Sequence, residues 1–547
     1  MSLGVAPVLA IGAARRRGLA ALSIACCLAL GGAALASAAI ASAAGAHAVH
    51  GKLHLRKRAL GAGAPAARPR WVCPKGACEA IVAPRPVRVG DGFALPQSRT
   101  LLQGGGELGG LDPEDLRSAY SIPATGGTGQ TVALIDAFGY PQAESDLARY
   151  RERYGLPACT TLNGCFEKVN EKGEQANYPE EEAEWDGEAA LDEDMVSAAC
   201  PGCHILLVEG STEAPADLGE SVNTAARLGA TEISNSYGYP EQDEEFCGTT
   251  GCSQFNADYA HPGVMIFASA GDSGFEDTYD GLGLQTNFPA SSPNVVAVGG
   301  TALLKDRKAA RGWREEVWNE PRIFAATGGG CSRFESKPAW QADAGCAGRT
   351  DNDVAADAAV KTGVSVRLDG EWQVYGGTSV ASPLLAGIEA HASSSERSLG
   401  ADAFYAAPGS LYDVTEGFSW DPFNGGSECA PNEYLCNAEV GYDGPTGLGT
   451  PDGVLGVLAA PTVTKVAPKS GPATGGTTVT ITGSGFTGAE EVKFATGEAR
   501  KLDVVSSTSM TAESPPGSVG TVNVTVTTPG GTSAVTTKDR FKYKKAK

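Results

Sequence analysis

Short apolar runs alternate with longer stretches of mixed polarity through the middle of the chain. The runs have the length and composition of buried strands and lie at residues 132–136, 205–209, 232–236, 264–269 and 295–298. Stretches such as 141–154 and 217–228 have helical character and lie between them. Strands that alternate with helices predict a parallel α/β sheet, in which ligand and catalytic groups gather at the carboxyl ends of the strands.

The pattern changes after about residue 460, where no helical periodicity remains. Residues 477–482 and 521–527 alternate apolar and polar positions with a period of two, and glycines and prolines lie between them. This pattern predicts a small immunoglobulin-like β-sandwich over residues 461–547.

The N-terminus has the pattern of a secretion signal. Residues 15–17 are three arginines, and an apolar run at 18–35 leads into Ala-Ser-Ala sequences. We expect a signal peptide over residues 1–43, cleaved between 36 and 44. A retained membrane anchor is the alternative, but small residues at the end of the run disfavour it. No other stretch is long and apolar enough to span a membrane, so the mature chain is predicted to be secreted and extracellular.

Residues 44–110 are rich in Ala, Gly, Pro and Arg and show little periodic hydrophobicity. They predict a short propeptide or linker. The order changes at 111–116, which has the acidic character of a helix start, and the main domain is expected over residues 111–460.

The charge and cysteine content agree with an exported protein. A net charge of −21 over 547 residues argues against nucleic acid as a partner and suits a soluble protein exposed to acid. Twelve of the 14 cysteines follow the signal and fall into near-neighbour pairs, which predict disulfides. The simplest connectivity is Cys73/Cys78, Cys159/Cys165, Cys200/Cys203, Cys247/Cys252, Cys331/Cys346 and Cys429/Cys436. Cys200-Pro-Gly-Cys203 could also be a redox motif or half of a zinc site, but no second Cys-x-x-Cys follows the signal.

One stretch, Tyr375-Gly-Gly-Thr-Ser379-Val-Ala-Ser-Pro383, indicates a loop that turns into a helix. Proline is tolerated in the first turn of a helix, and the apolar run at 384–388 would be the buried helix body. A serine at such a helix start lies where backbone N–H groups favour negative charge, which suits a nucleophile whose attack creates an oxyanion. Ser379 could equally be a helix cap.

A serine nucleophile needs a base, and histidine is nearly absent. Only His204, His261 and His391 follow the propeptide, and none has the sequence context of a catalytic histidine. Gly271-Asp272-Ser273-Gly274 resembles the serine string of chymotrypsin-like proteases, but that fold is all-β. Gly377-Thr378-Ser379 with Pro383 resembles the serine string of subtilisins, and Asp136 ends a strand as their aspartate does, yet the subtilisin histidine helix is missing.

An acidic helix stands in place of the histidine helix. Glu188 and Asp192 are four residues apart and share one helix face. An ordinary solvated acidic face is the simplest interpretation. If the two carboxyls were buried together, one pKa would rise and the pair could share a proton, so that a glutamate could serve as base and acid in acid solution.

From about residue 111 to 451 the chain resembles the sedolisins, serine-carboxyl peptidases with a subtilisin-like fold in which glutamate replaces the histidine. The motifs that carry this resemblance are Glu188-x-x-x-Asp192, 234–238 (Ser-Asn-Ser-Tyr-Gly), 269–274, 288–293, 328–332, Trp340-Gln341, 376–379 and 446–451. The resemblance implies that Ser379 is the nucleophile, Glu188 the base and later the acid, Asp192 the group that orients Glu188, and Asp272 the oxyanion-hole aspartate.

Two carboxyls in these roles favour activity in acid. An ionised carboxylate only accepts hydrogen bonds, so Asp272 can stabilise an oxyanion only while it is protonated. The ordinary pKa values of about 3.9 for Asp and 4.3 for Glu predict an acidic optimum.

The resemblance also implies a structural Ca²⁺ site. Asp413 and Asp443 would give side-chain oxygens, and Val414, Glu439 and Gly441 would give backbone carbonyls. The family usually has glycine where Glu439 stands, which a carbonyl ligand tolerates unless the position needs a positive φ. Two turn aspartates without a metal are the alternative. Sedolisins also usually carry a large folded propeptide, from which the short 44–110 segment departs.

The C-terminal stretch resembles the IPT/TIG immunoglobulin-like domains through 468–472, 475–479 and 483–486. Glycan, cell-surface or substrate contact and a passive spacer are equally consistent with it.

These observations together predict a secreted, calcium-binding, serine-type endopeptidase that acts on peptides and proteins. A tripeptidyl-type exopeptidase and a non-catalytic adhesion or binding protein are the alternatives. The intact set of four catalytic residues disfavours the binding protein.

Overall fold

The computed structural model describes residues 69–545, except for 72–76, 90–91, 96–100, 242, 244–245, 249–250, 276–285, 393, 420–432, 456–460, 485, 487–488, 490, 507–508 and 529–530. The predicted signal peptide, Cys73 and Cys429 lie outside these residues. In the described part of the chain, no helix is both long and apolar enough to cross a membrane.

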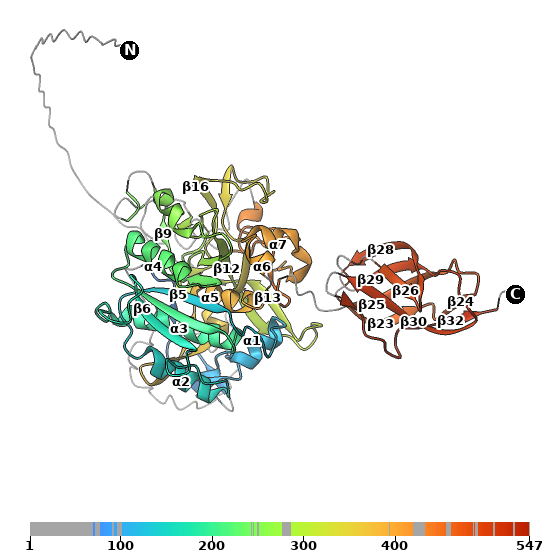
Figure 1. Cartoon of the computed structure of the whole chain (residues 1–547), viewed down its shortest axis with the longest axis horizontal. Helices are drawn as coiled ribbons and strands as arrows, with labels where there is room; N and C mark the ends of the chain where they lie inside the picture. Colours follow the sequence, from blue (N-terminus) through green and yellow to red (C-terminus); the bar gives the residue numbers. More distant parts are fainter. Residues whose placement is uncertain are drawn as a thin grey trace, which may run out of the picture. The chain divides into compact units, whose positions relative to one another are not determined.

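A sheet of eight strands forms the centre of the main domain (Figure 1). The strand order is β13-β12-β10-β8-β5-β7-β6, with β18 paired to β12, and every pair except β12–β13 is parallel. The strands are β5 (Thr131–Ala137), β6 (Phe166–Asn170), β7 (His204–Gly210), β8 (Glu232–Asn235), β10 (Met265–Ser269), β12 (Val296–Lys305), β13 (Trp313–Val317) and β18 (Val354–Asp357). The central strands are almost continuously apolar because both of their faces are buried.

Helices cover both faces of this sheet, as Figure 1 shows. α3 (Ala183–Ala199) and α5 (Thr378–Glu389) pack against each other, and α2 (Ala143–Arg153) and α1 (Pro113–Ala119) pack against α3. α4 (Pro215–Arg227) lies on β5, β7 and β8 with the 3-10 helix η2 (Cys252–Tyr259) beside it. The parallel α/β architecture predicted from the alternating runs is confirmed.

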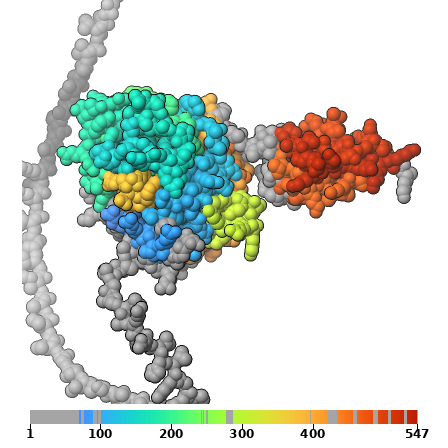
Figure 2. Space-filling model, turned by 90° about the horizontal axis from the view of Figure 1, so that it is seen from below, coloured from blue at the N-terminus to red at the C-terminus, as the bar shows by residue number. Residues whose placement is uncertain are grey.

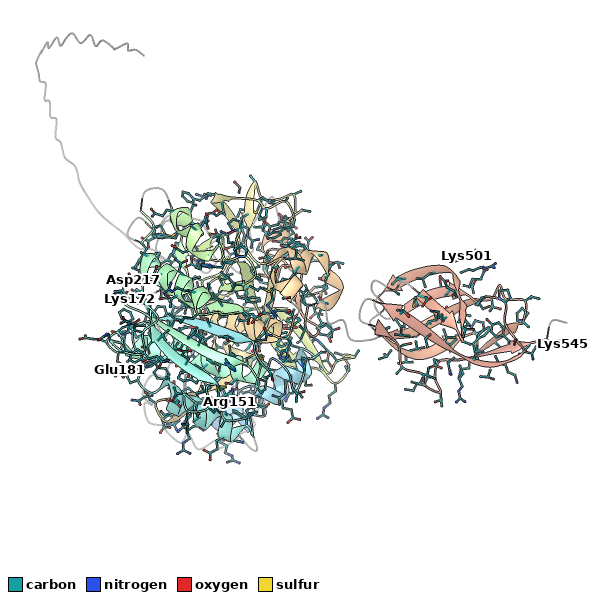
Figure 3. The ribbon with its side chains drawn as sticks, viewed as in Figure 1. Arg151, Lys172, Glu181, Asp217, Lys501 and Lys545 are labelled. Carbon is teal, nitrogen blue, oxygen red and sulfur yellow. A yellow bond between two sulfur atoms is a disulfide. The ribbon has the colours of Figure 1, made fainter. Side chains whose placement is uncertain are left out.

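Buried Arg151, labelled in Figure 3, ties α2 to the end of α3. Its guanidinium donates to Ser197 Oγ at 3.1 Å and to the Pro157 and Pro201 carbonyls at 2.6 and 2.5 Å. A buried charge is tolerated here because three acceptors replace its water.

A strand from the predicted propeptide pairs with the main domain. β1 (Arg70–Trp71), β2 (Ile81–Val82), β20 (Glu371–Gly376) and β19 (Val364–Leu368) form a four-stranded sheet in that order. Figure 2 shows the gold surface near residue 370 beside the blue surface of the N-terminal residues. The domain boundary at residue 111 stays a prediction, but the described residues before it are packed on the domain.

Shorter elements complete the main domain. They are β3 (Val87–Val89), β4 (Gly92–Ala94), η1 (Glu107–Gly109), β9 (Tyr239–Pro240), β11 (Asn287–Phe288), β14 (Asn319–Glu320), η3 (Pro321–Ile323), β15 (Ala325–Ala326), β16 (Cys331–Ser336), β17 (Gly348–Thr350), η4 (Val360–Thr362), α6 (Ser394–Arg397), α7 (Asp402–Ala406), η5 (Pro408–Ser410), β21 (Leu411–Tyr412), η6 (Glu433–Leu435) and β22 (Thr450–Pro451).

The C-terminal residues form a separate β-sandwich with its own core, as the period-two pattern predicts. One sheet has the order β23-β25-β29-β28, and the other has the order β24-β32-β30-β26-β27 with β31 paired to β30. The strands are β23 (Thr462–Ala467), β24 (Ser470–Pro472), β25 (Thr478–Ser484), β26 (Glu491–Phe494), β27 (Gly497–Glu498), β28 (Arg500–Ser506), β29 (Ser509–Glu513), β30 (Gly520–Thr528), β31 (Gly531–Thr532) and β32 (Arg540–Lys544). Val479, Ile481, Val524 and Phe541 are fully buried between the two sheets.

Four of the predicted disulfides are present: Cys159–Cys165, Cys200–Cys203, Cys247–Cys252 and Cys331–Cys346. Cys78 and Cys436 are also disulfide-bonded, and their partners lie outside the described residues. Cys200-Pro-Gly-Cys203 is therefore a local disulfide that closes the end of α3.

The helix start at Ser379 differs from the sequence prediction in two ways. Gly377 is the N-cap and no side chain caps α5, so Ser379 lies inside the first turn and is not a cap. Pro383 is the sixth residue of the helix and not in its first turn. Its missing N–H leaves the Ser379 carbonyl without the usual helical partner, so the helix is weakened close to the serine.

Candidate active site

The four residues predicted to be catalytic come together at the carboxyl ends of the central strands. α3 carries Glu188 and Asp192, the turn after β10 carries Asp272, and the first turn of α5 carries Ser379. The Glu188 carboxyl interacts with the other three: the charges of Asp192 and Asp272 act on it, and the Ser379 side chain is hydrogen-bonded to it. All four are buried: Glu188, Asp192 and Ser379 are 0% exposed and Asp272 is 2% exposed.

The Glu188–Asp192 pair is a buried carboxyl pair and not a solvated acidic face. Burial, followed by the charge of Asp192, raises the pKa of Glu188 well above its usual value, and the Ser379 hydroxyl opposes part of that rise. Burial and the charge of Asp136 raise the pKa of Asp192, while a 2.8 Å hydrogen bond from Ser236 Oγ lowers it. Two negative charges this close together and shielded from water repel each other strongly. The pair therefore keeps a proton at pH values where free carboxyls are ionised.

Further buried acids surround this pair. Asp136 is 1% exposed at the end of β5, and burial and the Glu209 charge raise its pKa to about 8. Burial also raises the pKa values of Glu193 and Asp194 on α3. The sequence pattern places Asp136 at a strand end but does not reveal that five acids of α3 are buried, because acidic helices are usually solvated.

Asp272 lies at the start of α5. Its Oδ1 accepts from the Thr378 amide at 2.7 Å and from Thr378 Oγ1 at 2.9 Å. These two donors fix the carboxyl beside the first turn of the helix, where the helix dipole favours negative charge. Thr378 was not predicted as a site residue, although it belongs to the Gly-Gly-Thr-Ser motif.

Ser236 joins the two halves of the site. Its hydroxyl binds Asp192, and its carbonyl accepts a long 3.5 Å hydrogen bond from Ser379 Oγ. It was missed as a functional residue, although it lies in the quoted 234–238 motif directly after β8.

The described histidines take no part in this site. His391 Nε2 lies 3.3 Å from the Ala199 carbonyl, and burial lowers the pKa of its ring. His261 Nε2 contacts the Asp258 carbonyl. Their positions agree with the interpretation of these residues as packing or surface histidines.

The segment 77–83 runs through the site as an extended strand. The Gly238 amide donates to the Ala77 carbonyl at 2.9 Å, and the Glu79 amide donates to the Ser236 carbonyl at 3.3 Å. On the other side of Ser379, Ile81 and Val82 pair antiparallel with Gly376 and Tyr375 of β20.

The Glu79 carbonyl lies at the start of α5, beside the backbone amide of Ser379. It accepts a 3.3 Å hydrogen bond from the backbone amide of Ser379. A Cβ on Gly377 would overlap both this carbonyl oxygen and Asp272 Oδ2, so the two oxygens lie beside the same point of the helix start. A peptide carbonyl therefore lies beside both the Ser379 amide and Asp272, the carboxyl predicted to line an oxyanion hole.

The predicted calcium ligands also lie in one place. The Gly441 amide donates to Asp413 Oδ2 at 3.0 Å, and Asp443 Oδ2 accepts from the Glu439 amide at 3.0 Å. Burial, opposed by its hydrogen bonds, raises the pKa of Asp443 to about 7, and the charge of Asp413 adds to the rise. Glu439 is not among the residues with positive φ, whereas Gly441 has φ +91°.

This donor set fits calcium in its chemistry. It consists of two carboxylates and a run of backbone carbonyls, and oxygen ligands in loose geometry are what calcium takes. The described residues hold no group of three or more His, Cys, Asp or Glu side chains that could bind a metal.

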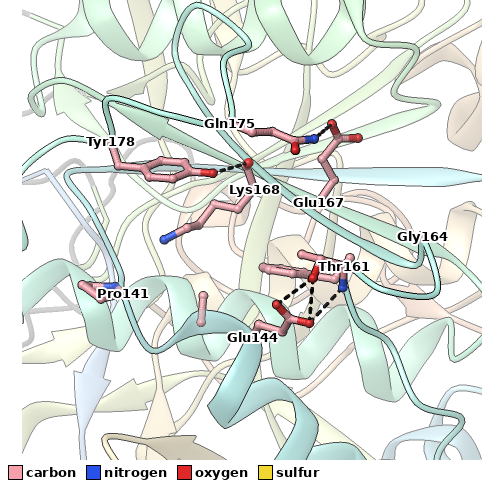
Figure 4. Close-up of a pocket in the computed structure, with 10 residues that line it drawn as sticks. Pro141, Glu144, Thr161, Gly164, Glu167, Lys168, Gln175 and Tyr178 are labelled. Atoms are coloured by element: carbon pink, nitrogen blue, oxygen red, sulfur yellow. Dashed lines mark hydrogen bonds between the residues drawn. The ribbon is translucent and has the colours of Figure 1, made fainter.

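A separate cavity of about 360 Å³ lies between the start of α2 and β6 (Figure 4). Tyr178 Oη donates to the Lys168 carbonyl, and Gln175 donates to Glu167 across its wall. None of the four predicted catalytic residues lines it.

Comparison with known families agrees with this geometry. Residues 184–405 match the subtilase family, and residues 461–543 match the IPT/TIG domain. These matches identify a peptidase-type domain of the subtilase kind within the main domain and an IPT/TIG domain in the C-terminal β-sandwich.

In sequence, the chain is similar to kumamolisin and to sedolisin. The chain is 33% identical to kumamolisin of Bacillus sp. (strain MN-32) over 357 residues, which covers 62% of each chain. It is 32% identical to sedolisin of Pseudomonas sp. (strain 101) over 371 residues, or 63% of this chain and 60% of that protein. The chain thus spans about 60% of the length of these curated relatives.

A solved structure gives the same relationship. Pseudomonas sedolisin, a serine-carboxyl proteinase complexed with two molecules of pseudo-iodotyrostatin, aligns with a TM-score of 0.52 and 28% identity. The match covers 63% of this chain and 95% of that one. The subtilisin-like fold expected from the motifs is confirmed.

Proposed function

We propose that the protein is a secreted, acid-active serine-carboxyl endopeptidase. The observation that carries this proposal is the burial of Ser379 beside the Glu188–Asp192 pair, with a peptide carbonyl hydrogen-bonded to the Ser379 amide.

The chemistry follows from the charges. Ser379 Oγ attacks the peptide carbonyl carbon and passes its proton to Glu188. Asp192 orients Glu188, and the two carboxyls share the proton that the pair already holds. The oxyanion forms against the Ser379 amide and protonated Asp272. Glu188 then gives its proton to the leaving nitrogen, and water releases the acyl group from Ser379 by the reverse path.

The chain's own strand supports endopeptidase action. Residues on both sides of Glu79 hydrogen-bond to the domain, so the cleft holds a polypeptide that extends in both directions from Ser379. An exopeptidase that removes tripeptides is the second candidate, because Glu213 Oε2 lies 3.3 Å from the Ala77 nitrogen, two residues before Glu79. A carboxylate at that position could bind a free N-terminal ammonium.

Cleavage of denatured casein from pH 2 to 8 tests the proposal. We expect a maximum below pH 5, and we expect that Ser379→Ala and Glu188→Gln each lower the rate by at least about 10³-fold while circular dichroism stays unchanged. Activity that survives in Ser379→Ala would identify another nucleophile, and a maximum near pH 8 would contradict the carboxyl mechanism. Internal casein fragments support the endopeptidase, whereas tripeptides released in register from free N-termini support the exopeptidase.

Two finer features belong to the same proposal. Calcium bound by the side chains of Asp413 and Asp443 and by the carbonyls of Val414, Glu439 and Gly441 would cross-link two loops and take no part in the reaction. The IPT/TIG domain is consistent with a binding role, and glycan or cell-surface contact stays a prediction for it.

A further inference from the structure

We propose that Glu79–Ala80 is a bond that this peptidase cuts in its own chain, and that the pocket for the residue before the cut accepts the side chain of glutamate or glutamine. The inference rests on the proposed peptidase function and goes beyond it in naming a cleavage site and a side-chain preference.

The backbone of the segment has the position of a substrate. Three backbone hydrogen bonds hold residues 77–79 on one side of the serine. The Gly238 amide donates to the Ala77 carbonyl, the Glu79 amide donates to the Ser236 carbonyl, and the Ser379 amide donates to the Glu79 carbonyl. Pairing of Ile81 with Gly376 and the 2.8 Å hydrogen bond from Ala83 N to Val374 O hold it on the other side. Glu79 is the residue whose carbonyl reaches the Ser379 amide, so Glu79–Ala80 is the bond presented for attack.

The Glu79 side chain fills a closed polar pocket and is 7% exposed. Asn287 Nδ2 donates to Glu79 Oε1 at 3.5 Å, and Thr378 Oγ1 lies 3.4 Å from Glu79 Oε2. Both contacts are long, and each donor also binds a second acceptor. Asn287 Nδ2 donates to the Ala270 carbonyl, and Thr378 Oγ1 donates to Asp272 Oδ1. The pocket therefore provides donors for a carbonyl-type oxygen.

Glycines make the space for this side chain. A Cβ on Gly238 would overlap Glu79 Oε1, and a Cβ on Gly271 would lie 3.4 Å from the same atom. Asp272, at the next position after Gly271, adds an acid at the pocket wall, which disfavours an ionised carboxylate. Glutamine, and glutamate carrying a proton, both present the oxygen that Asn287 can reach without adding a charge.

The cleavage step balances without any co-reactant except water. Ser379 Oγ bonds to the Glu79 carbonyl carbon as its proton moves to Glu188. The Glu79–Ala80 C–N bond breaks, and Ala80 nitrogen takes that proton and becomes a new N-terminus. Water then cleaves the ester, which leaves a C-terminal carboxyl on Glu79 and restores the Ser379 hydroxyl.

The first experiment acidifies the purified full chain and follows intact mass, N-terminal sequence and casein cleavage with time. We expect a new N-terminus at Ala80 before casein cleavage begins, and no cut at this bond in Ser379→Ala. In the full chain, Glu79→Gln is expected to be cut at a rate within a few-fold of wild type and Glu79→Lys at least about 10-fold more slowly. Glu114→Lys, an exposed change of the same charge outside the cleft, is the control and should be cut normally.

Peptides test the pocket independently of folding effects in the N-terminal segment. The acid-treated enzyme is given acetyl-Ala-Ser-Xaa-Ala-Ile-Val-Ala, which copies residues 77–83 with serine for Cys78. Glutamate and glutamine at Xaa should give kcat/KM values at least about 10-fold above those for lysine or leucine. In the enzyme, Gly238→Ala should lower kcat/KM for the peptide with glutamate at Xaa at least about 10-fold more than kcat/KM for a peptide with alanine at Xaa, a change in preference that mere destabilisation would not cause.

The outcomes separate the two proposals. This inference is overturned if casein is cleaved while Glu79–Ala80 stays intact, if the new N-terminus lies elsewhere, or if the enzyme shows no preference among the peptides. Each of these results leaves the peptidase function standing. No cleavage of casein, of the peptides or of the chain itself at any pH overturns both.

Discussion

Gly377 is the residue on which the geometry of the proposed oxyanion site depends most directly. Its φ of +113° is a backbone conformation that side chains rarely adopt, and a Cβ there would overlap the Glu79 carbonyl oxygen and Asp272 Oδ2. Glycine at this position therefore lets a peptide carbonyl approach the start of α5 closely.

We expect Gly377→Ala to lower kcat/KM by at least about 10²-fold, the effect of losing one oxyanion donor, because the methyl group displaces the carbonyl from the Ser379 amide. Peptide hydrolysis at the optimal pH, with circular dichroism to monitor folding, measures this.

Gly155→Ala is the matched control. Gly155 also has a positive φ, of +66°, but a Cβ there meets no atom within 4 Å. It should carry a smaller backbone strain, because a φ of +66° lies in the left-handed region that other residues can adopt, and it should keep full activity. Equal losses in the two variants would show that strain, and not the carbonyl contact, explains the effect.

The distance between helices α3 and α5 sets the distance between the proposed base, Glu188, and the proposed nucleophile, Ser379. α3 carries Glu188 and α5 carries Ser379, and the two helices pack directly on each other. Gly387 permits this close approach, since a Cβ there would lie 2.7 Å from Ala199 Cβ.

Gly387→Ala is expected to destabilise the protein by about 1–3 kcal/mol through overpacking. Ala199→Gly in the same chain removes the opposing methyl group, so the double variant should be more stable than the sum of the single effects by at least about 0.5 kcal/mol. Urea unfolding of the four proteins measures the coupling. Strict additivity would mean that the two helices do not meet at this point.

The loops around Asp413 and Asp443 are a second element-scale feature. If they hold calcium, free calcium at 100 times its Kd should stabilise the chain by about 2.7 kcal/mol, and EGTA should remove that stabilisation. Thermal melting with and without EGTA tests this, with Asp413→Asn expected to abolish the calcium dependence and Glu416→Gln, an exposed acid nearby, to keep it. A melting temperature that does not respond to calcium in the wild-type chain would contradict the site.

At the scale of the whole molecule, the main domain buries several carboxyls, one on strand β5 and four along helix α3. Asp136, Glu188, Asp192, Glu193 and Asp194 all have pKa values raised by burial. The folded chain therefore keeps protons that the unfolded chain loses.

This arrangement predicts greater stability in acid than at neutral pH. Between the unfolded pKa of about 4 and the raised folded values, the native state binds more protons than the unfolded state, so the free energy of unfolding falls as pH rises. For Asp136 the window extends from about 4 to about 8. One pKa unit corresponds to about 1.4 kcal/mol, so several kcal/mol should be lost between pH 4 and pH 8.

Urea denaturation at pH 4 and pH 8 checks this expectation. The Ser379→Ala variant is used so that proteolysis does not interfere. Asp136→Asn should reduce the pH dependence because it removes one of the titrating groups. A chain that is more stable at pH 8 than at pH 4 would show that these carboxyls are not buried in solution.

Much of this fold could be predicted from the sequence because the strands are short, apolar and separated by helical stretches. The four candidate residues could be named only because their motifs, such as Gly-Gly-Thr-Ser, resemble those of the sedolisins. The residues alone left Ser379 as a possible helix cap and Glu188 and Asp192 as a possible solvated face. Ser236, Thr378 and Asn287 could not be assigned roles, since each acts through contacts with residues far away in the chain. The path of residues 77–83 through the cleft was also unforeseen, because a segment rich in Ala and Pro carries no periodic signal and its pairing partner, β20, lies about 290 residues later.

The pairing of residues 81–82 with β20 has a consequence for competition at the active site. A strand tethered to its own cleft is present at an effective concentration on the order of millimolar, whatever the protein concentration. Any peptide or inhibitor must displace that strand, and its apparent affinity is weakened by the ratio of this effective concentration to the strand's own dissociation constant. The uncut chain should therefore be almost invisible to active-site ligands, and dilution alone should not expose the site.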